Sequence, residues 1–306
     1  MKTLRTIVVA SILQLSIITQ AHALNNRTWV SGKGTDIAGC GPVGNPCRTL
    51  QYAHDNTVAG GEINVLDAAG YGSVAIGKAI SIINDGAGVA GVLASSGGNG
   101  VTITAGSDDD IFLRGLTIQG AGTGLRGIVF YGGRALSVSK CSIQSFTDSG
   151  IYLETSSNVL TPAAVRIADV TIEKSGTNGI HQKGGPLRIQ AEGVAISRAS
   201  FGILLDPSSG TTSASINATH ISFGVIGIEF ASAGGTVIGS IDSSSVHGSP
   251  GNIGFYVNAV GTMYLSRSVS RGFNAGANGT GSGKIYSYGN NMLEDSGAGV
   301  VAIPMR

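Results

Sequence analysis

Seven polar and aromatic residues stand at two equivalent places of a repeated motif, in which a glycine precedes an apolar residue. The residue after each copy, and the residue two further along, include Tyr152, His181, Glu229 and Tyr256, and Glu154, Lys183 and Asp206, respectively. Aromatic rings can support a sugar ring, while carboxylates, an imidazole and an amine can bind hydroxyl groups or move protons. The set predicts a saccharide groove formed by Tyr152, Glu154, His181, Lys183, Asp206, Glu229 and Tyr256.

The same residues also have a purely structural explanation. With strands about 4.8 Å apart, the order of acid, base and acid at Glu154, Lys183 and Asp206 allows ion pairs along a solvated ladder. Surface pairs of this kind contribute at most about 1 kcal/mol each. Catalysis is a third interpretation, in which a lysine or histidine abstracts a proton beside a uronate carboxyl, or two carboxylates hydrolyse a glycosidic bond. We assign no residue a catalytic role.

A run of three acids offers a second candidate site. Asp108 and Asp110, together with nearby carbonyl oxygens, have the oxygen ligands that calcium prefers. Consecutive acids also cap or solubilise turns, and this run follows Ala105-Gly106-Ser107. We therefore expect no cofactor, with calcium at Asp108 and Asp110 as the alternative.

Internal repetition indicates how these residues are positioned. The glycine-apolar motif recurs every 23 to 29 residues, at Gly127-Ile128, Gly150-Ile151, Gly179-Ile180, Gly202-Ile203, Gly227-Ile228 and Gly254-Phe255. Upstream of it, apolar residues occupy the first, third, sixth and eighth places, as in Leu136, Val138, Cys141 and Ile143. The copies at Ile111 and Val165 keep all four places, whereas later copies keep two or three.

A repeat of this length, built from short alternating strands, is typical of a solenoid because a single unit cannot bury its apolar face alone. The sequence predicts an all-β, right-handed parallel β-helix of about nine or ten coils, roughly 45 Å long at this strand spacing. Cys141 shares its place with Leu116 and Val170, so we expect it to face the core. A leucine-rich repeat is less consistent, since its regular ladder of Leu and Asn is missing.

The ends of the solenoid need closing elements. Helix-like spacing within residues 46–56 predicts a short amphipathic helix that caps the first coil. Residues 275–283 are almost all Gly, Asn, Ala and Ser, which favours a loop before a last strand at 284–288. Residues 154–162 predict a loop that bulges between two ordinary strands.

The first 23 residues have the basic, apolar and small-residue order of a cleaved secretion signal. We expect an N-terminal cap at 24–60 and the β-helix at 61–306, in a monomer that is secreted, periplasmic or on the cell surface. An oxidising compartment would allow a disulfide between Cys40 and Cys47, seven residues apart. A net charge of +1 gives no case for nucleic acid, and no later segment is long enough to span a membrane.

Several N-terminal motifs resemble bacterial right-handed parallel β-helix repeat proteins of the pectin-lyase-like superfamily. They are Thr28-Trp29-Val30-Ser31-Gly32, Asn45-Pro46-Cys47-Arg48-Thr49 and Gly60-Gly61-Glu62-Ile63-Asn64-Val65-Leu66-Asp67. The resemblance spans nearly the whole mature chain and implies architecture more than activity, since the superfamily includes polysaccharide lyases, hydrolases and phage tailspikes. Gly179-Ile180-His181 and Arg188-Ile189-Gln190 depart from the Gly-His-Gly and Arg-Ile-Lys motifs of polygalacturonases.

Three function classes follow. The first is an exported, non-catalytic structural module that contacts saccharides or other cell-surface components. The second is a polysaccharide lyase or glycoside hydrolase that acts in a groove on one sheet face. The third is a protein-binding surface module.

Overall fold

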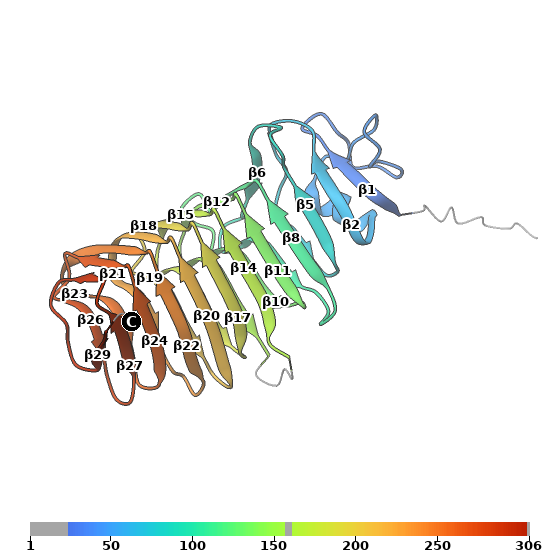
Figure 1. The fold of residues 1–306 in the computed structure, drawn as a ribbon. Coiled ribbons are helices and arrows are strands. Elements are labelled where there is room, and N and C mark those ends of the chain that lie inside the picture. The colour runs from blue at the N-terminus through green and yellow to red at the C-terminus, as the bar shows by residue number, and fades with distance from the viewer. Residues whose placement is uncertain (1–23, 157–160, 305–306) are drawn as a thin grey trace, which may run out of the picture.

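The computed structural model describes residues 24–156 and 161–304, which form stacked parallel strands and one short helix. The coils build a rod, with β1 (Asn25–Val30) near one end and β29 (Val300–Ile303) near the other (Figure 1). The predicted parallel β-helix is therefore confirmed. The expected secretion signal, at 1–23, lies outside the described residues. No helix in the described part is long and apolar enough to cross a membrane.

Each coil contributes one strand to a 12-stranded sheet, which we call sheet A. Its strands pair in parallel throughout. In order, they are β1, β2 (Thr57–Val65), β5 (Ile80–Ile83), β8 (Asp110–Arg114), β11 (Ala135–Ser139), β14 (Ala163–Ala168), β17 (Leu187–Glu192), β20 (Thr211–Asn217), β22 (Thr236–Asp242), β24 (Gly261–Ser266), β27 (Lys284–Tyr288) and β29.

The second sheet has 17 strands and consists of two rows. Row B1 follows sheet A in each coil and contains β3 (Ala69–Gly70), β6 (Ala90–Leu93), β9 (Leu116–Gln119), β12 (Ser142–Phe146), β15 (Thr171–Ser175), β18 (Ala195–Ser197), β25 (Val269–Arg271) and β28 (Met292–Leu293). Row B2 follows row B1 and contains β4 (Val74–Ile76), β7 (Asn99–Thr104), β10 (Arg126–Gly132), β13 (Ser149–Thr155), β16 (Asn178–Gly184), β19 (Phe201–Pro207) and β26 (Ala275–Gly279). Two longer strands run through both rows, β21 (His220–Phe230) and β23 (Ser245–Val257).

The glycine-apolar motif marks the same place on each strand of row B2. Ile128, Ile151, Ile180, Ile203, Ile228 and Phe255 are partners on successive strands, and all are buried. A Cβ atom added at Gly179 would lie 2.6 Å from the carbonyl oxygen of Gly202 and 2.5 Å from a methyl group of Ile196. The motif recurs because the next coil approaches the backbone too closely for any side chain.

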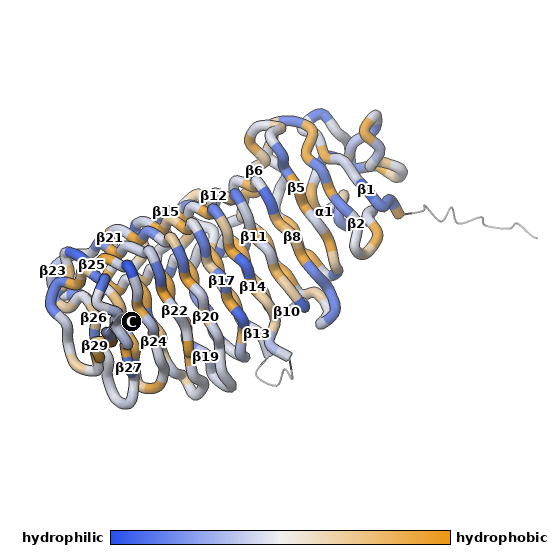
Figure 2. The backbone as a smooth tube through the Cα atoms, in the orientation of Figure 1, coloured by the Kyte–Doolittle hydropathy of each residue, from blue (hydrophilic) through white to orange (hydrophobic). Residues whose placement is uncertain are grey.

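The apolar pattern of the upstream motif follows from a one-residue corner between sheet A and row B1. Its residue has a positive φ in successive coils, including Lys140 (52°), Asp169 (55°) and Gly193 (63°). The corner lies between the third and sixth places, so two neighbouring residues point away from the core there. Elsewhere polar and apolar residues alternate along the strands, as expected when every second side chain faces inward (Figure 2).

The sixth place lines the interior at this corner. Cys141 is buried there as a free thiol, which confirms the predicted inward position, and burial raises its pKa to about 11. Toward the C-terminus the same place becomes polar, at Thr219, Ser244, Ser268 and Asn291. The backbone N–H groups of Thr219 and Ser244 donate to the next hydroxyl, at 3.2 and 3.3 Å, and that of Ser268 donates to Asn291 Oδ1 at 2.8 Å.

The N-terminal end is closed by helix α1 (Leu50–Asp55), which lies within the range predicted for a capping helix. Thr49 caps it by accepting a hydrogen bond from the Tyr52 N–H at 3.2 Å. A disulfide joins Cys40 and Cys47, whose Cα atoms are 5.0 Å apart. Strand β2 crosses residue 60, so the region expected to be a separate cap shares sheet A with the β-helix.

The C-terminal end differs from expectation. The strand predicted at 284–288 is present as β27, but residues 275–279 form strand β26 instead of a loop. Strand β26 pairs with β23, and its small residues are largely buried, with Ala277 in the core. Strands β28 and β29 follow β27, so β27 is not the last strand.

Candidate saccharide-binding face

The register of row B2 brings the predicted site residues together. Tyr152, His181, Leu204, Glu229 and Tyr256 are partners on successive strands. Glu154, Lys183 and Asp206 form a second, shorter column beside them. We call the outward side of β10, β13, β16, β19, β21 and β23 the B2 face.

Two members of the first column are buried although they point away from the core. Tyr152 is 5% exposed and Glu229 is 6% exposed, so neither belongs to a solvated ladder as one interpretation expected. The ion pairs expected in the second column do not form: no contact within 4.0 Å joins Lys183 to Glu154 or to Asp206. Glu154 instead accepts a hydrogen bond from the Tyr152 hydroxyl at 3.1 Å.

Arg126 and Asp148 account for the burial of Tyr152. The guanidinium carbon of Arg126 lies 3.6 Å from the centre of the Tyr152 ring. Its Nε atom lies 2.6 Å from Asp148 Oδ2, in an ion pair that is mostly shielded from solvent. Burial raises the pKa of the Tyr152 hydroxyl to about 12, so it stays protonated at neutral pH. Arg126 also covers one face of this ring, which leaves Tyr152 a poorer sugar platform than predicted.

His181 packs edge-on against Tyr152, with the ring centres 5.3 Å apart. Burial lowers the pKa of the imidazole below its ordinary value of 6.5, since the charged form loses its hydration. Asn178 lies beside it, 2% exposed, with Nδ2 3.5 Å from His181 Nδ1 and 3.3 Å from Ser149 Oγ. The Oδ1 atom of Asn178 has no hydrogen-bond partner. The site therefore holds a neutral imidazole next to an unsatisfied buried amide.

The other end of the column contains an acid with the opposite shift. Burial raises the pKa of Glu229, and the Asn258 amide, which donates to Glu229 Oε1 at 3.4 Å, only partly offsets this effect. The Tyr256 hydroxyl lies 3.3 Å from Thr280 Oγ1. A site that holds an imidazole and a carboxyl with displaced pKa values is a functional candidate on physical grounds.

Two adjoining hollows lie beside row B2, and the smaller one borders Glu154 and Lys183 of the second column. One has a volume of about 430 Å³ and is lined by Tyr131, Glu154, Thr155, Ser156, Lys183, Gly184 and Ser208. The other has a volume of about 580 Å³ and shares Tyr131, Thr155 and Ser156 with the first. Both volumes lie in the range of small-ligand sites. The loop predicted at 154–162 begins only at residue 156, because Glu154 and Thr155 belong to β13; Ser156 borders both hollows, and residues 157–160 lie outside the described part.

The calcium candidates are partly occupied by protein groups. Arg134 contacts both carboxylate oxygens of Asp110, and Asp109 accepts a hydrogen bond from the Gly106 N–H at 2.7 Å. Within residues 24–156 and 161–304, the group spaced for a metal is Asp36, Cys40 and Cys47, but both sulfurs belong to the disulfide. Calcium at Asp108 and Asp110 stays a prediction, and the ion pair between Arg134 and Asp110 does not favour it.

Sequence reasoning missed Arg126, Ser149 and Asn178. They occupy a third column of the B2 face, because each stands directly before a glycine-apolar motif. Extending the alignment by one residue toward the N-terminus would have found them. Asp148 lies in the turn before β13, where the repeat gives no signal.

The fold is shared with enzymes that act on polysaccharides. A family profile described as "Right handed beta helix region" matches residues 126–215. The solved structure of "pectate lyase Pel9A" is similar over 90% of this chain and 79% of its own, with 15% identity and a TM-score of 0.62. A "rhamnogalacturonan lyase" is similar over 90% of this chain and 84% of its own, with 10% identity and a TM-score of 0.51.

No curated protein matches the chain in sequence. At 10 to 15% identity, the two structural similarities show the fold alone. Together with the parallel strands and the matched profile, they establish the architecture and its handedness. The chain is a right-handed parallel β-helix, a fold that it shares with this pectate lyase and this rhamnogalacturonan lyase.

Proposed function

We propose that this protein is an exported module that binds a carbohydrate polymer on the B2 face, beside the hollow at Glu154 and Lys183. One observation carries the proposal: outward-facing polar residues of this face are packed against one another, with displaced pKa values, next to a cavity. Burying polar groups costs desolvation free energy and the fold does not require it on an outer face, so a binding role explains this packing better. The similarity to two polysaccharide lyases supports a carbohydrate ligand, and the basic and apolar start of the chain supports export.

The residues around the hollow suit a sugar. Tyr131 is exposed and offers a ring for stacking. Lys183 and Glu154 lie on adjacent strands, where they supply a donor and an acceptor for the hydroxyl groups of a sugar. A polymer lying across β13, β16 and β19 would meet Glu154, Lys183 and Asp206 in turn.

Retention on immobilised polysaccharides tests the proposal. We expect the wild-type protein to bind at least one polymer of a glycan array, and the variant Glu154→Ala/His181→Ala/Lys183→Ala to lose that binding. The matched control is Arg114→Ala/Arg166→Ala/Glu192→Ala, which removes three exposed side chains of sheet A. Binding that survives the first variant would refute the proposal. A wild-type protein that binds no polymer would favour a protein-binding module.

A second candidate function is elimination from a uronate polymer. His181 favours it, because a neutral imidazole can accept the proton beside the uronate carboxyl while an alkene forms and the glycosidic oxygen leaves. Incubation with pectate, alginate and glycosaminoglycans would reveal it by the absorbance of unsaturated products. New reducing ends without that absorbance would indicate hydrolysis instead. We expect His181→Ala to abolish any elimination, and turnover that persists in this variant would exclude His181 as the base.

A further inference from the structure

A second surface feature lies at the corner where row B1 turns into row B2. In four successive coils this corner has a residue with positive φ, at Ser145 (63°), Lys174 (54°), Arg198 (58°) and Phe223 (62°). Such a conformation is unfavourable for residues other than glycine, asparagine and aspartate, most of all for bulky ones. Three large side chains are therefore presented on consecutive coils at a cost in backbone strain.

Phe223 is the clearest case. Its side chain is 74% exposed, the highest value among the large hydrophobic residues of the described chain. It is also an extra residue in the strand pairing, since Ser222 pairs with His247 and Gly224 with Gly248. A strained and solvated phenylalanine contributes nothing to the core, and such strain concentrates at functional sites.

The two cations of the corner are unpaired. Among the arginines of the described residues, Arg198 alone has a guanidinium without a hydrogen bond, ion pair or ring contact, whereas Arg126, Arg134 and Arg267, for example, each contact an acid. The Lys174 amine also has no partner in the described part of the chain. Free cations on adjacent strands repel one another, so their placement suits an external anion.

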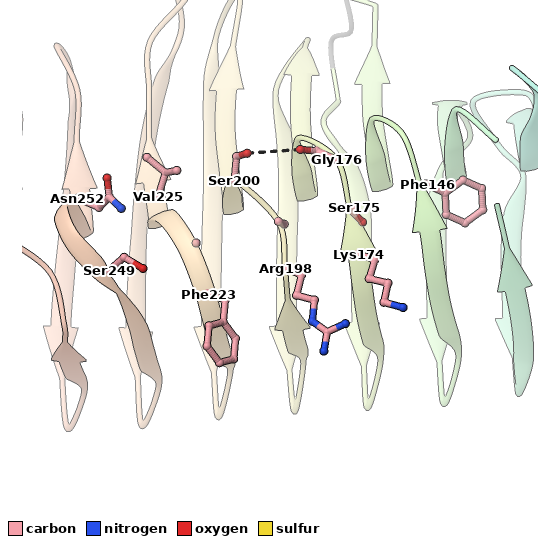
Figure 3. A pocket seen from close by; sticks show the side chains of 12 residues that line it. Phe146, Lys174, Ser175, Gly176, Arg198, Ser200, Phe223, Val225, Ser249 and Asn252 are labelled. Atoms are coloured by element: carbon pink, nitrogen blue, oxygen red, sulfur yellow. Dashed lines mark hydrogen bonds between the residues drawn. The ribbon is translucent and has the colours of Figure 1, made fainter. Parts of the chain in front are cut away.

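A groove of about 490 Å³ runs along this corner. Figure 3 shows Lys174, Arg198 and Phe223 side by side from consecutive coils, with Arg198 between the other two. Ser200, Ser249 and Asn252 add polar groups to the lining. The groove thus combines two cations and one exposed ring within about two strand spacings, roughly 10 Å, and its hydrogen-bonding groups extend one strand further, to Ser249 and Asn252 on β23.

We propose that this corner groove binds an anionic sugar, with Lys174 and Arg198 pairing its acidic groups and Phe223 stacking on a ring face. The acidic group is a carboxylate or a sulfate, both of which a guanidinium and an ammonium bind. The site goes beyond the saccharide face proposed above, because it uses none of the B2-face residues named there. It lies across the turn that separates the two rows.

Calorimetric titration with three oligosaccharides tests the inference: oligogalacturonate with carboxylates, a heparin-derived hexasaccharide with sulfates as well, and a neutral dextran fragment. We expect the wild type to bind at least one anionic probe, more weakly as salt increases, and not to bind the dextran. The variant Lys174→Asn/Arg198→Asn should lose about tenfold or more in affinity for that probe, because both charges disappear. Asparagine tolerates the left-handed backbone, so the corner stays folded.

Phe223→Asn separates strain from binding. It should weaken binding several-fold while the melting temperature stays equal or rises, since an unfavourable backbone conformation is relieved. The control is Lys140→Asn, which removes an exposed cation with the same backbone conformation at the other corner. We expect that control to bind as the wild type does.

The outcomes are distinct. Binding of oligogalacturonate alone identifies a carboxylate ligand, and binding of the heparin fragment alone identifies a sulfated one. A wild type that binds neither anionic probe, or a Lys174→Asn/Arg198→Asn variant with unchanged affinity, overturns the inference. Glu154→Ala/His181→Ala/Lys183→Ala should keep this binding. If this triple variant no longer binds the anionic probe while Lys174→Asn/Arg198→Asn still binds it, the ligand binds on the B2 face. That result would refute the corner site and leave the proposed function intact.

Discussion

Side chains alternate inward and outward in the same way on the strands of sheet A and row B2. The polar side chains on the two outer faces nevertheless differ in how far they are exposed to solvent. On sheet A, Arg166 and Glu192 meet at 3.4 Å with more than half of each side chain exposed. On row B2, Arg126 and Asp148 meet at 2.6 Å with less than a quarter exposed, and Tyr152 is buried beneath them. The fold requires only an inward apolar row, so the β-helix alone does not account for the packed outer polar set of row B2, whereas the ligand binding proposed above would.

The largest expected effect comes from the Arg126 ion pair. Arg126→Ala leaves the Asp148 carboxylate without its partner and uncovers the Tyr152 ring, so we expect a loss of about 2 kcal/mol in unfolding free energy. Urea denaturation, monitored by circular dichroism, measures it. A loss below about 0.5 kcal/mol would mean that the ion pairs of the two faces contribute equally little to stability.

Glu229 should give a smaller change of opposite sign. Its pKa is raised in the folded protein, so its favourable contribution is complete below the ordinary value of 4.5 and is lost as pH rises through the folded value. Glu229→Gln removes the buried charge, and we expect a gain on the order of 1 kcal/mol at pH 7 that vanishes near pH 4. Thermal unfolding at both pH values tests this, and a variant less stable at pH 7 would contradict it.

His181 should set the pH response of the B2 face. Its pKa is lowered, so its contribution to stability is present above the ordinary value of 6.5 and is lost as pH falls through the folded value. We expect His181→Gln to lose less stability than the wild type between pH 7.5 and pH 5. Parallel slopes for the two proteins would show that the imidazole is not shielded.

The smallest effect belongs to sheet A. Arg166→Ala should change the unfolding free energy by less than about 0.5 kcal/mol, since solvent screens its pair with Glu192. The same urea experiment serves as the reference for Arg126→Ala. A loss equal to that of Arg126→Ala would remove the contrast between the faces.

The fold was predictable because every coil meets the same two packing requirements. The backbone approaches the next coil at Gly179 and its equivalents, and apolar residues fill the inside. The prediction was less accurate in the later coils, where another residue fills a place that an apolar residue of the repeat fills in the earlier coils. A Cβ at Gly239 would lie 3.0 Å from the Phe230 ring, so this ring fills the space that a side chain takes in earlier coils. Hydroxyl groups such as Ser244 replace apolar residues in the later interior.

The columns of the B2 face were predictable for the same reason, since Tyr152, His181 and Glu229 follow the repeat. Their burial was not, because it depends on Arg126 reaching across to Asp148 in a turn. The corner groove was hidden as well. Lys174, Arg198 and Phe223 share no residue type, and only the backbone conformation shows that they occupy one place.

The one-residue corner between sheet A and row B1 also determines where the chain tolerates change. In the coils from β8–β9 to β24–β25, one added residue at this corner would reverse the inward and outward sides of the next strand, whereas the earlier coil has residues 84–89 between β5 and β6. The connections from row B2 to sheet A are free of this restriction: residues 185–186 join β16 to β17, whereas residues 156–162 join β13 to β14. The edge that borders the hollow at Glu154 can therefore change in length while the strands beneath it keep their register.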